Sequence, residues 1–119
     1  MDKFLAVFVG GGIGSLGRYS LGLLVQRLGF AGIFPWATLL ANTLACLVFA
    51  LVMVFFKDKM GSTLAILLTT GFCGGLSTFS TFSVETVDLV NKQLYGLAAF
   101  NIFVSLVLCL GCIMLVARV

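Results

Sequence analysis

Long apolar runs separated by short polar gaps make up almost the whole chain. Four runs, at residues 4–26, 35–56, 63–90 and 94–116, are almost free of charged side chains, and most Lys, Arg and Asp residues lie between them or at the two ends. About 20 apolar residues in a helix cross a ~30 Å hydrocarbon core, so each run is long enough to span a membrane. The pattern predicts one all-α membrane domain over residues 1–119, with four transmembrane helices joined by tight turns.

Composition supports an integral membrane protein and excludes several other classes. Of the 119 residues, 61% are hydrophobic and 9% are charged, whereas soluble domains carry about a quarter charged residues. The net charge of +3 is small and the basic residues do not cluster, which argues against nucleic-acid binding. Residues 1–15 lack an A-x-A cleavage site and their apolar run continues past Arg18, so we do not expect a signal peptide. With no His and no catalytic cluster, an enzyme is not expected.

Basic residues are almost evenly divided between the two ends of the expected bundle. With four spans, both termini and the 57–62 loop share one side. Four basic residues lie there and three lie opposite: Lys3, Lys57, Lys59 and Arg118 against Arg18, Arg27 and Lys92. Because an excess of Lys and Arg sets orientation, this small difference predicts insertion in both directions and an antiparallel, dual-topology homodimer. A single, weakly specified topology is the alternative.

The third apolar run is too long for a straight helix through the membrane. Residues 63–90 would form a helix of about 42 Å at 1.5 Å per residue, so this span is either tilted or broken. Gly71, Gly74 and Gly75 near its middle favour a break within the membrane, although glycines also serve plain helix packing. In a broken helix, freed carbonyls can hold a cation and half-helix N-termini can face an anion.

Hydroxyl and phenylalanine side chains alternate directly after these glycines, in "STFSTFS". Helical spacing gives three stripes: Phe79 with Phe82, Ser80 with Ser83, and Ser77 with Thr81. A Phe pair is often core, and hydroxyls often bond back to the i−4 carbonyl. Together, however, they present positive aromatic edges and O–H donors without a fixed charge. This surface suits a small, hard anion that exchanges its water for many weak donors.

Other polar or reactive residues in the spans have simpler interpretations. Glu85 and Asp88 are intramembrane carboxylates, which are functional candidates by default, but their place near the end of the third run favours a structural role.

The four cysteines, at 46, 73, 109 and 112, also lie in the runs, and Cys109 and Cys112 are i, i+3 neighbours. We interpret them as packing residues rather than as a metal or redox site. Gly10 and Gly14 have the G-x-x-x-G spacing of closely packed helices.

Three segments together resemble one known family. "GFCGGLSTFSTFSVE" at 71–85 closely resembles the signature of the Fluc/CrcB fluoride channels. "GGGIGSLGRY" at 10–19 looks like the glycine-rich first helix of that family with its arginine, and "FPWATLLANTL" at 34–44 looks like the start of its second helix. Length and the number of spans agree, so the resemblance covers essentially the whole chain. Asn101 and Cys109 depart from the usual pattern of the fourth helix.

The resemblance implies a passive, fluoride-selective channel in the bacterial inner membrane. A negative-inside potential would drive fluoride out with about 2.3 kcal/mol per charge per 100 mV and so reduce its toxicity. The family further implies an antiparallel homodimer with a structural Na⁺ on its axis, held by the backbone carbonyls of Gly74 and Ser77 from both broken third helices. The fluoride pathway would comprise seven residues: Arg18, Asn42, Phe79, Ser80, Thr81, Phe82 and Ser105.

Two other functions have a comparable architecture. A small multidrug-type, dual-topology transporter needs a carboxylate deep in its first helix to exchange protons for cationic substrates, but Arg18 is the only charged residue in 4–26. A non-transporting membrane assembly subunit would suit the glycine-rich helices, yet it gives no reason for the Phe/Ser/Thr arrangement after a break.

Overall fold

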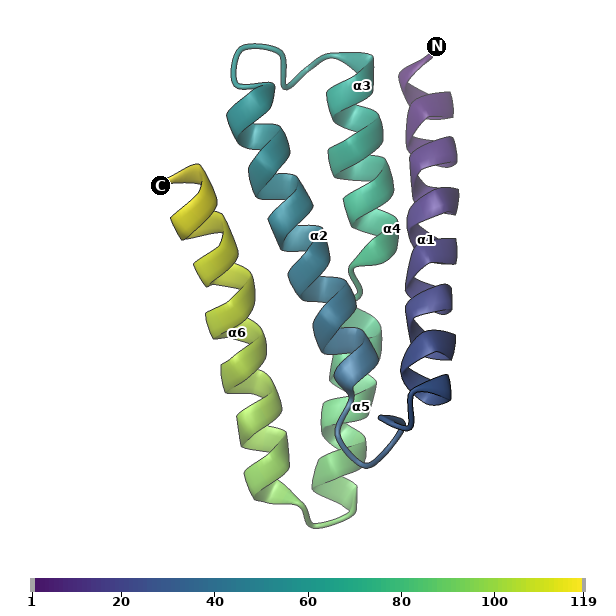
Figure 1. Ribbon diagram of the computed structural model, residues 1–119, viewed down its shortest axis with the longest axis vertical. Coiled ribbons are helices and arrows are strands. Elements are labelled where there is room, and N and C mark those ends of the chain that lie inside the picture. Colours follow the sequence, from purple (N-terminus) through teal and green to yellow (C-terminus); the bar gives the residue numbers. More distant parts are fainter. Residues whose placement is uncertain (1, 119) are drawn as a thin grey trace.

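The computed structural model describes residues 2–118, which contain four helical spans long and apolar enough to cross a membrane and no strand (Figure 1). The spans are α1 (Lys3–Arg27), α2 (Trp36–Phe55), a third span (Thr63–Asn91) and α6 (Tyr95–Ala117). The expected all-α class with four potential membrane helices is therefore confirmed.

The third span consists of several pieces. It runs through α3 (Thr63–Ile66), the π-helical segment η1 (Leu67–Cys73), α4 (Gly74–Leu76) and α5 (Phe79–Asn91). Between α4 and α5 the backbone is extended, with φ −79° and ψ 151° at Ser77 and φ −151° and ψ 115° at Thr78. The three glycines that favour a break in the sequence lie within helical segments, and the helix is interrupted after them.

Local signals in the sequence set the ends of the helices. Asp2, Ser62 and Thr78 are N-caps whose side-chain oxygens each accept a backbone N–H of the following turn. At the end of α1, Gly29 has φ +81°, a left-handed conformation that glycine adopts without strain. Its N–H donates to Gln26 O at 3.2 Å, and Phe30 N–H donates to Val25 O at 3.0 Å. This pair of bonds is a Schellman motif, and it turns the chain toward α2.

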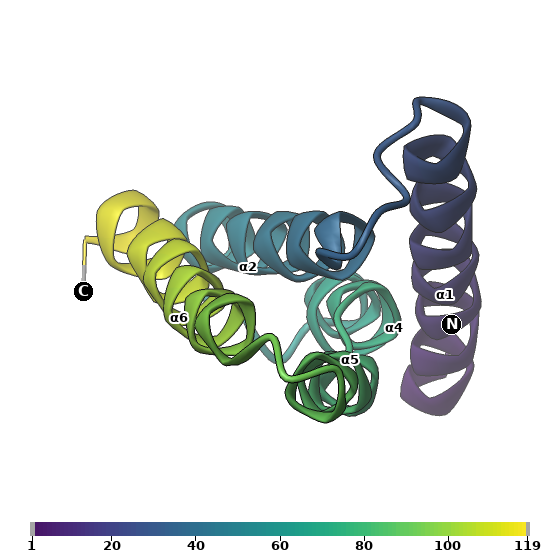
Figure 2. The same cartoon turned by 90° about the horizontal axis from the view of Figure 1, so that it is seen from below.

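The third span lies between α1 and α2, and α6 packs on the other side of α2 (Figures 1 and 2). The start of α1, the end of α6 and the 56–62 turn lie at one end of the bundle (Figure 1). In the central contact, Ala41 and Ala45 of α2 meet Cys73 and Leu76 of the third span.

Glycines allow α1 and the third span to touch through their backbones. A Cβ atom added to Gly10 or Gly14 would lie under 3.0 Å from backbone atoms of Leu67, Phe72 or Leu76. A Cβ atom added to Gly75, in the third span, would likewise lie under 3.0 Å from the backbone of α1. The G-x-x-x-G spacing of Gly10 and Gly14 therefore serves a contact inside the chain.

Candidate functional site

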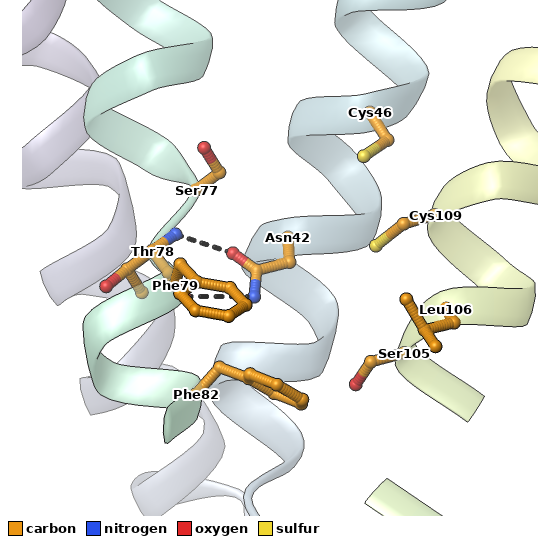
Figure 3. Close-up of a pocket in the computed structure, with 9 residues that line it drawn as sticks. All are labelled: Asn42, Cys46, Ser77, Thr78, Phe79, Phe82, Ser105, Leu106 and Cys109. Atoms are coloured by element: carbon orange, nitrogen blue, oxygen red, sulfur yellow. Dashed lines mark hydrogen bonds between the residues drawn. The ribbon is translucent and has the colours of Figure 1, made fainter. Parts of the chain in front are cut away.

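The interruption of the third span is held by a side chain from α2. Asn42 Oδ1 accepts the backbone N–H of Thr78 at 2.7 Å, and Asn42 Nδ2 donates to the carbonyl oxygen of Thr78 at 3.3 Å. Both bonds are visible in Figure 3. An extended residue inside an apolar bundle would otherwise leave both groups without helical partners, which costs several kcal/mol per group in lipid. Asn42 thus satisfies both polar backbone groups of Thr78.

A second side chain reaches the same region from α1. Arg18 Nε donates to the carbonyl oxygen of Gly75 at 3.1 Å. Ser77 completes the upstream side, because its Oγ and its N–H both donate to Cys73 O, at 2.7 and 2.9 Å. Three helices therefore fix the path of the chain around the interruption.

The interruption also diverts the N–H groups that would pair with two particular carbonyls in a continuous helix. Thr78 N–H, which would donate to Gly74 O, donates to Asn42. Thr81 N–H, which would donate to Ser77 O, donates instead to Thr78 Oγ1 at 3.2 Å. The two diverted carbonyls belong to the residues for which the family resemblance implies sodium coordination.

Polar groups and aromatic rings share one cavity beside the interruption, which we call the aromatic pocket (Figure 3). Its volume is about 250 Å³, and nine residues line it: Asn42, Cys46, Ser77, Thr78, Phe79, Phe82, Ser105, Leu106 and Cys109. The ring centroids of Phe79 and Phe82 are 5.7 Å apart, and the planes are tilted by 39°. The lining carries three hydroxyl groups, the Asn42 amide and two aromatic rings but no charged side chain.

A second cavity lies on the α1 side of Thr78, which lines both cavities. We call it the arginine cavity; its volume is about 370 Å³, and Arg18, Gln26, Thr38 and Thr81 contribute polar groups to it. Thr38 also donates through Oγ1 to the carboxylate of Glu85 on α5. This contact supports the structural interpretation of Glu85, since a neighbouring hydroxyl satisfies one of its oxygens.

One hydrogen bond connects α6 to α5, and a further bond within each helix extends it to residues of the aromatic pocket. Asn101, only 1% exposed, donates through Nδ2 to Thr86 Oγ1 at 3.0 Å, and Thr86 donates to Phe82 O at 2.7 Å. Ser105 Oγ donates to Asn101 Oδ1 at 3.5 Å. Asn101 of the fourth span therefore supports two pocket residues, Phe82 and Ser105.

The structure brings some of the predicted residues together and separates others. Asn42, Ser77, Phe79, Phe82 and Ser105 share the aromatic pocket. Arg18 and Thr81 instead line the arginine cavity, and Gly74 lines a third cavity of about 350 Å³, again with Ser77.

Two hydroxyl predictions need separate comment. Ser80 is exposed, and its Oγ lies 3.2 Å from Thr78 Oγ1. The expectation that Ser77 and Thr81 share one helical stripe is wrong, because Ser77 precedes α5 and is extended.

Sequence reasoning missed Thr78, the residue common to both cavities. The position of Thr78 could have identified it, because a threonine directly before a helical run is a typical N-cap. Thr38 and Thr86 were also missed, and nothing in the sequence connects either residue to its partner on another helix. Within residues 2–118, no group of three or more His, Cys, Asp or Glu side chains is suited to a metal ion.

The fold and the site define a small multi-pass membrane protein with an uncharged polar pocket beside an interrupted span. Residues 5–117 match the family described as "CrcB-like protein, Camphor Resistance (CrcB)". The chain belongs to this CrcB-like family, which confirms the resemblance.

Curated relatives carry a functional name. The chain is 41% identical over 108 residues to the "Fluoride-specific ion channel FluC" of Escherichia coli O139:H28 (strain E24377A / ETEC), covering 89% of this chain and 84% of that protein. The protein of the same name from Shigella boydii serotype 18 (strain CDC 3083-94 / BS512) gives the same identity and coverage. These relatives are named as channels, not as enzymes.

Proposed function

We propose that the protein is a passive, fluoride-selective channel that exports cytoplasmic fluoride. The observation that carries the proposal is the aromatic pocket, where Phe79, Phe82, Asn42 and Ser105 surround a space without any charged side chain. A small anion can exchange its water there for ring edges and weak donors without being trapped by a fixed cation. The names of the 41% identical relatives support this function.

The pathway runs through Thr78, between the two cavities. Arg18 gives the arginine cavity a positive charge that attracts an anion, while Thr81 adds a hydroxyl. Asn42 Nδ2 carries two N–H groups, and the bond to Thr78 O uses one of them. The other is available to an ion in the aromatic pocket. Ser80, exposed at the start of α5, extends the row of hydroxyls.

We further propose a structural Na⁺ bound by the carbonyls of Gly74 and Ser77. Support comes from the diversion of their usual helical donors, Thr78 N–H and Thr81 N–H, to side chains. Carbonyl oxygens are suitable ligands for a hard cation. Both residues line the same cavity, and a Cβ added at Gly74 would meet nothing within 4 Å, so this face is open to further ligands.

Those further ligands come from a second copy in an antiparallel, dual-topology homodimer. Phe79 is 79% exposed although it belongs to the aromatic pocket. In the most apolar windows of the four spans, the buried share is at most 33%. A second copy covering this face would close the pocket and pair the carbonyls around one ion. The nearly balanced basic residues permit both orientations in a bacterial inner membrane.

The function is tested in bacterial cells that lack their own fluoride exporter. Expression of the protein is expected to restore growth in fluoride medium and to lower intracellular fluoride. Continued accumulation of fluoride, with the protein present in the membrane, would contradict the proposal. The multidrug-type alternative predicts resistance to cationic drugs, whereas an assembly subunit predicts no change in either solute.

A further inference from the structure

Two cysteines from different helices line the aromatic pocket. Cys46 is on α2 and Cys109 is on α6, and both are half-buried with free thiols. Figure 3 shows their side chains in the space between α2 and α6, above Asn42 and Ser105. Their roles as packing residues do not account for this shared position in the pocket.

The sequence suggested a different pair, because Cys109 and Cys112 are neighbours on one helix. Cys112 is absent from the pocket lining, although it lies only one turn further along α6. Cys73 is buried to 3% exposure and lines the third cavity, to which Cys46 also contributes. Of the four thiols, only those of Cys46 and Cys109 line the aromatic pocket.

We propose that Cys46 and Cys109 form a binding site for a soft, two-coordinate cation of the Hg²⁺ type. Within residues 2–118 no third His, Cys, Asp or Glu joins them in a metal-binding group, so the tetrahedral site that Zn²⁺ prefers cannot be completed. Soft metal ions bind thiolates preferentially, and a linear ion needs only two of them.

The charge balance also suits a site inside a membrane. Each thiol loses its proton to form one metal–sulfur bond, so Hg²⁺ and two thiols give a neutral bis-thiolate complex and two protons. A neutral complex avoids the large penalty for a charge in apolar surroundings. Asn42, Ser105 and the two phenylalanines line the same pocket, and none of them is a preferred ligand for a soft cation.

Occupancy of this site blocks the aromatic pocket. This consequence rests on the proposed function, because it requires fluoride to pass through the same space. Binding of the metal does not rest on it, and the two are measured separately.

The first experiment measures metal binding by the purified, full-length protein without reductant. After incubation with limiting HgCl₂, intact-mass spectrometry is expected to show one mercury per protomer with the loss of two protons. Four variants locate the bridge, each with a single Cys→Ser change at position 46, 73, 109 or 112. Bridging is expected to be lost in Cys46→Ser and Cys109→Ser and retained in Cys73→Ser and Cys112→Ser. Cys46→Ala and Cys109→Ala repeat the test should a serine variant fold poorly.

A bridge that survives in Cys46→Ser but disappears in Cys112→Ser would overturn the site in favour of the pair on α6. Loss of the bridge in Cys73→Ser, with retention in Cys109→Ser, would overturn it in favour of the third cavity.

The second experiment adds HgCl₂ to liposomes that release fluoride. Each protein is compared with its own efflux rate before the metal is added: HgCl₂ is expected to stop efflux through the wild-type protein and to leave the rate of the Cys46→Ser/Cys109→Ser double variant as it was without metal. Unchanged efflux with the bridge formed would overturn the block, whereas a protein without any efflux would refute the proposed function alone.

Discussion

Asn42 and Thr78 are joined by two hydrogen bonds, at 2.7 and 3.3 Å. Through them the Asn42 side chain pairs with both the backbone N–H and the backbone carbonyl of Thr78. This pairing ties α2 to the interruption of the third span. It also frees the carbonyl of Gly74, because Thr78 N–H is no longer available to it. The local path of the chain, the aromatic pocket and the proposed sodium site all depend on this contact.

Removal of the Asn42 amide is therefore expected to damage both stability and flux. Asn42→Ala leaves Thr78 N–H and C=O without these partners, at a cost of about 1–3 kcal/mol for each group. Thermal unfolding in detergent is expected to shift to lower temperature, and fluoride efflux is expected to be lost. Thr43→Ala is the matched control, because Thr43 bonds only to Leu39 O in its own helix. Wild-type melting and flux in Asn42→Ala would refute this role.

The two phenylalanines are expected to be required for flux but not for assembly. Phe79→Ile or Phe82→Ile keeps an apolar side chain but removes the positive ring edge that we propose contacts the anion. Fluoride efflux is therefore expected to be abolished or sharply reduced in either variant. Phe103→Ile is the control, because Phe103 is 67% exposed and does not line the pocket. Full efflux in both pocket variants, measured on correctly assembled protein, would remove the pore role of these rings.

Glycines in α1 are expected to differ sharply in their tolerance of a methyl group. Gly10→Ala and Gly14→Ala force a Cβ against the backbone of the third span, and such overpacking costs about 1–3 kcal/mol or more. Gly12→Ala meets nothing within 4 Å and is expected to be neutral or to gain up to ~1 kcal/mol of helix propensity. Chemical or thermal unfolding of the three variants measures the difference. Equal melting of all three would contradict the close contact.

Sodium is expected to stabilise the protein specifically. Exchange of Na⁺ for a large organic cation leaves the carbonyls of Gly74 and Ser77 unpaired, so unfolding is expected to occur at lower temperature. At a Na⁺ concentration a hundred times its dissociation constant, binding adds about 2.7 kcal/mol to the free energy of unfolding. Readdition of Na⁺ should restore the melting temperature and K⁺ should not. Identical melting in all three salts would exclude a structural sodium.

Extra positive charge in the 57–62 loop is expected to bias the topology. Two added lysines make one orientation dominant, so antiparallel pairs become rare and fluoride efflux falls. Two lysines added to the opposite 91–93 turn form the matched variant. Coexpression of the two oppositely biased chains is expected to restore flux, and recovery can be compared with either chain alone. Full activity of a chain shown to insert in one orientation would contradict the antiparallel dimer.

The sequence predicted the helical spans well because long apolar runs have few alternatives in a membrane. The observed ends of the four spans differ from the expected limits by at most one residue, as for Lys3 against 4 and Asn91 against 90. The glycines were harder to interpret, since a glycine can break a helix or let another helix approach. Gly71 and Gly75 do the latter, and the extended residues are Ser77 and Thr78.

The site could be predicted only in part, for a similar reason. The hydroxyl and phenylalanine pattern identified Phe79 and Phe82, which lie three apart on one helix. Contacts between distant helices leave no such periodic signal. The pairing of Asn101 with Thr86, and of Thr38 with Glu85, depends on how the helices are placed side by side. The same holds for Cys46 and Cys109, which are far apart in the sequence and line one pocket.

The most direct test of the central claim is fluoride efflux from liposomes that contain the purified protein. A fluoride electrode records the release, a potassium ionophore sets the membrane voltage, and a parallel sample records chloride. We predict rapid, voltage-driven release of fluoride with chloride retained, without ATP or a proton gradient. Release no faster than from empty liposomes, with protein shown to be folded and inserted, would contradict the account.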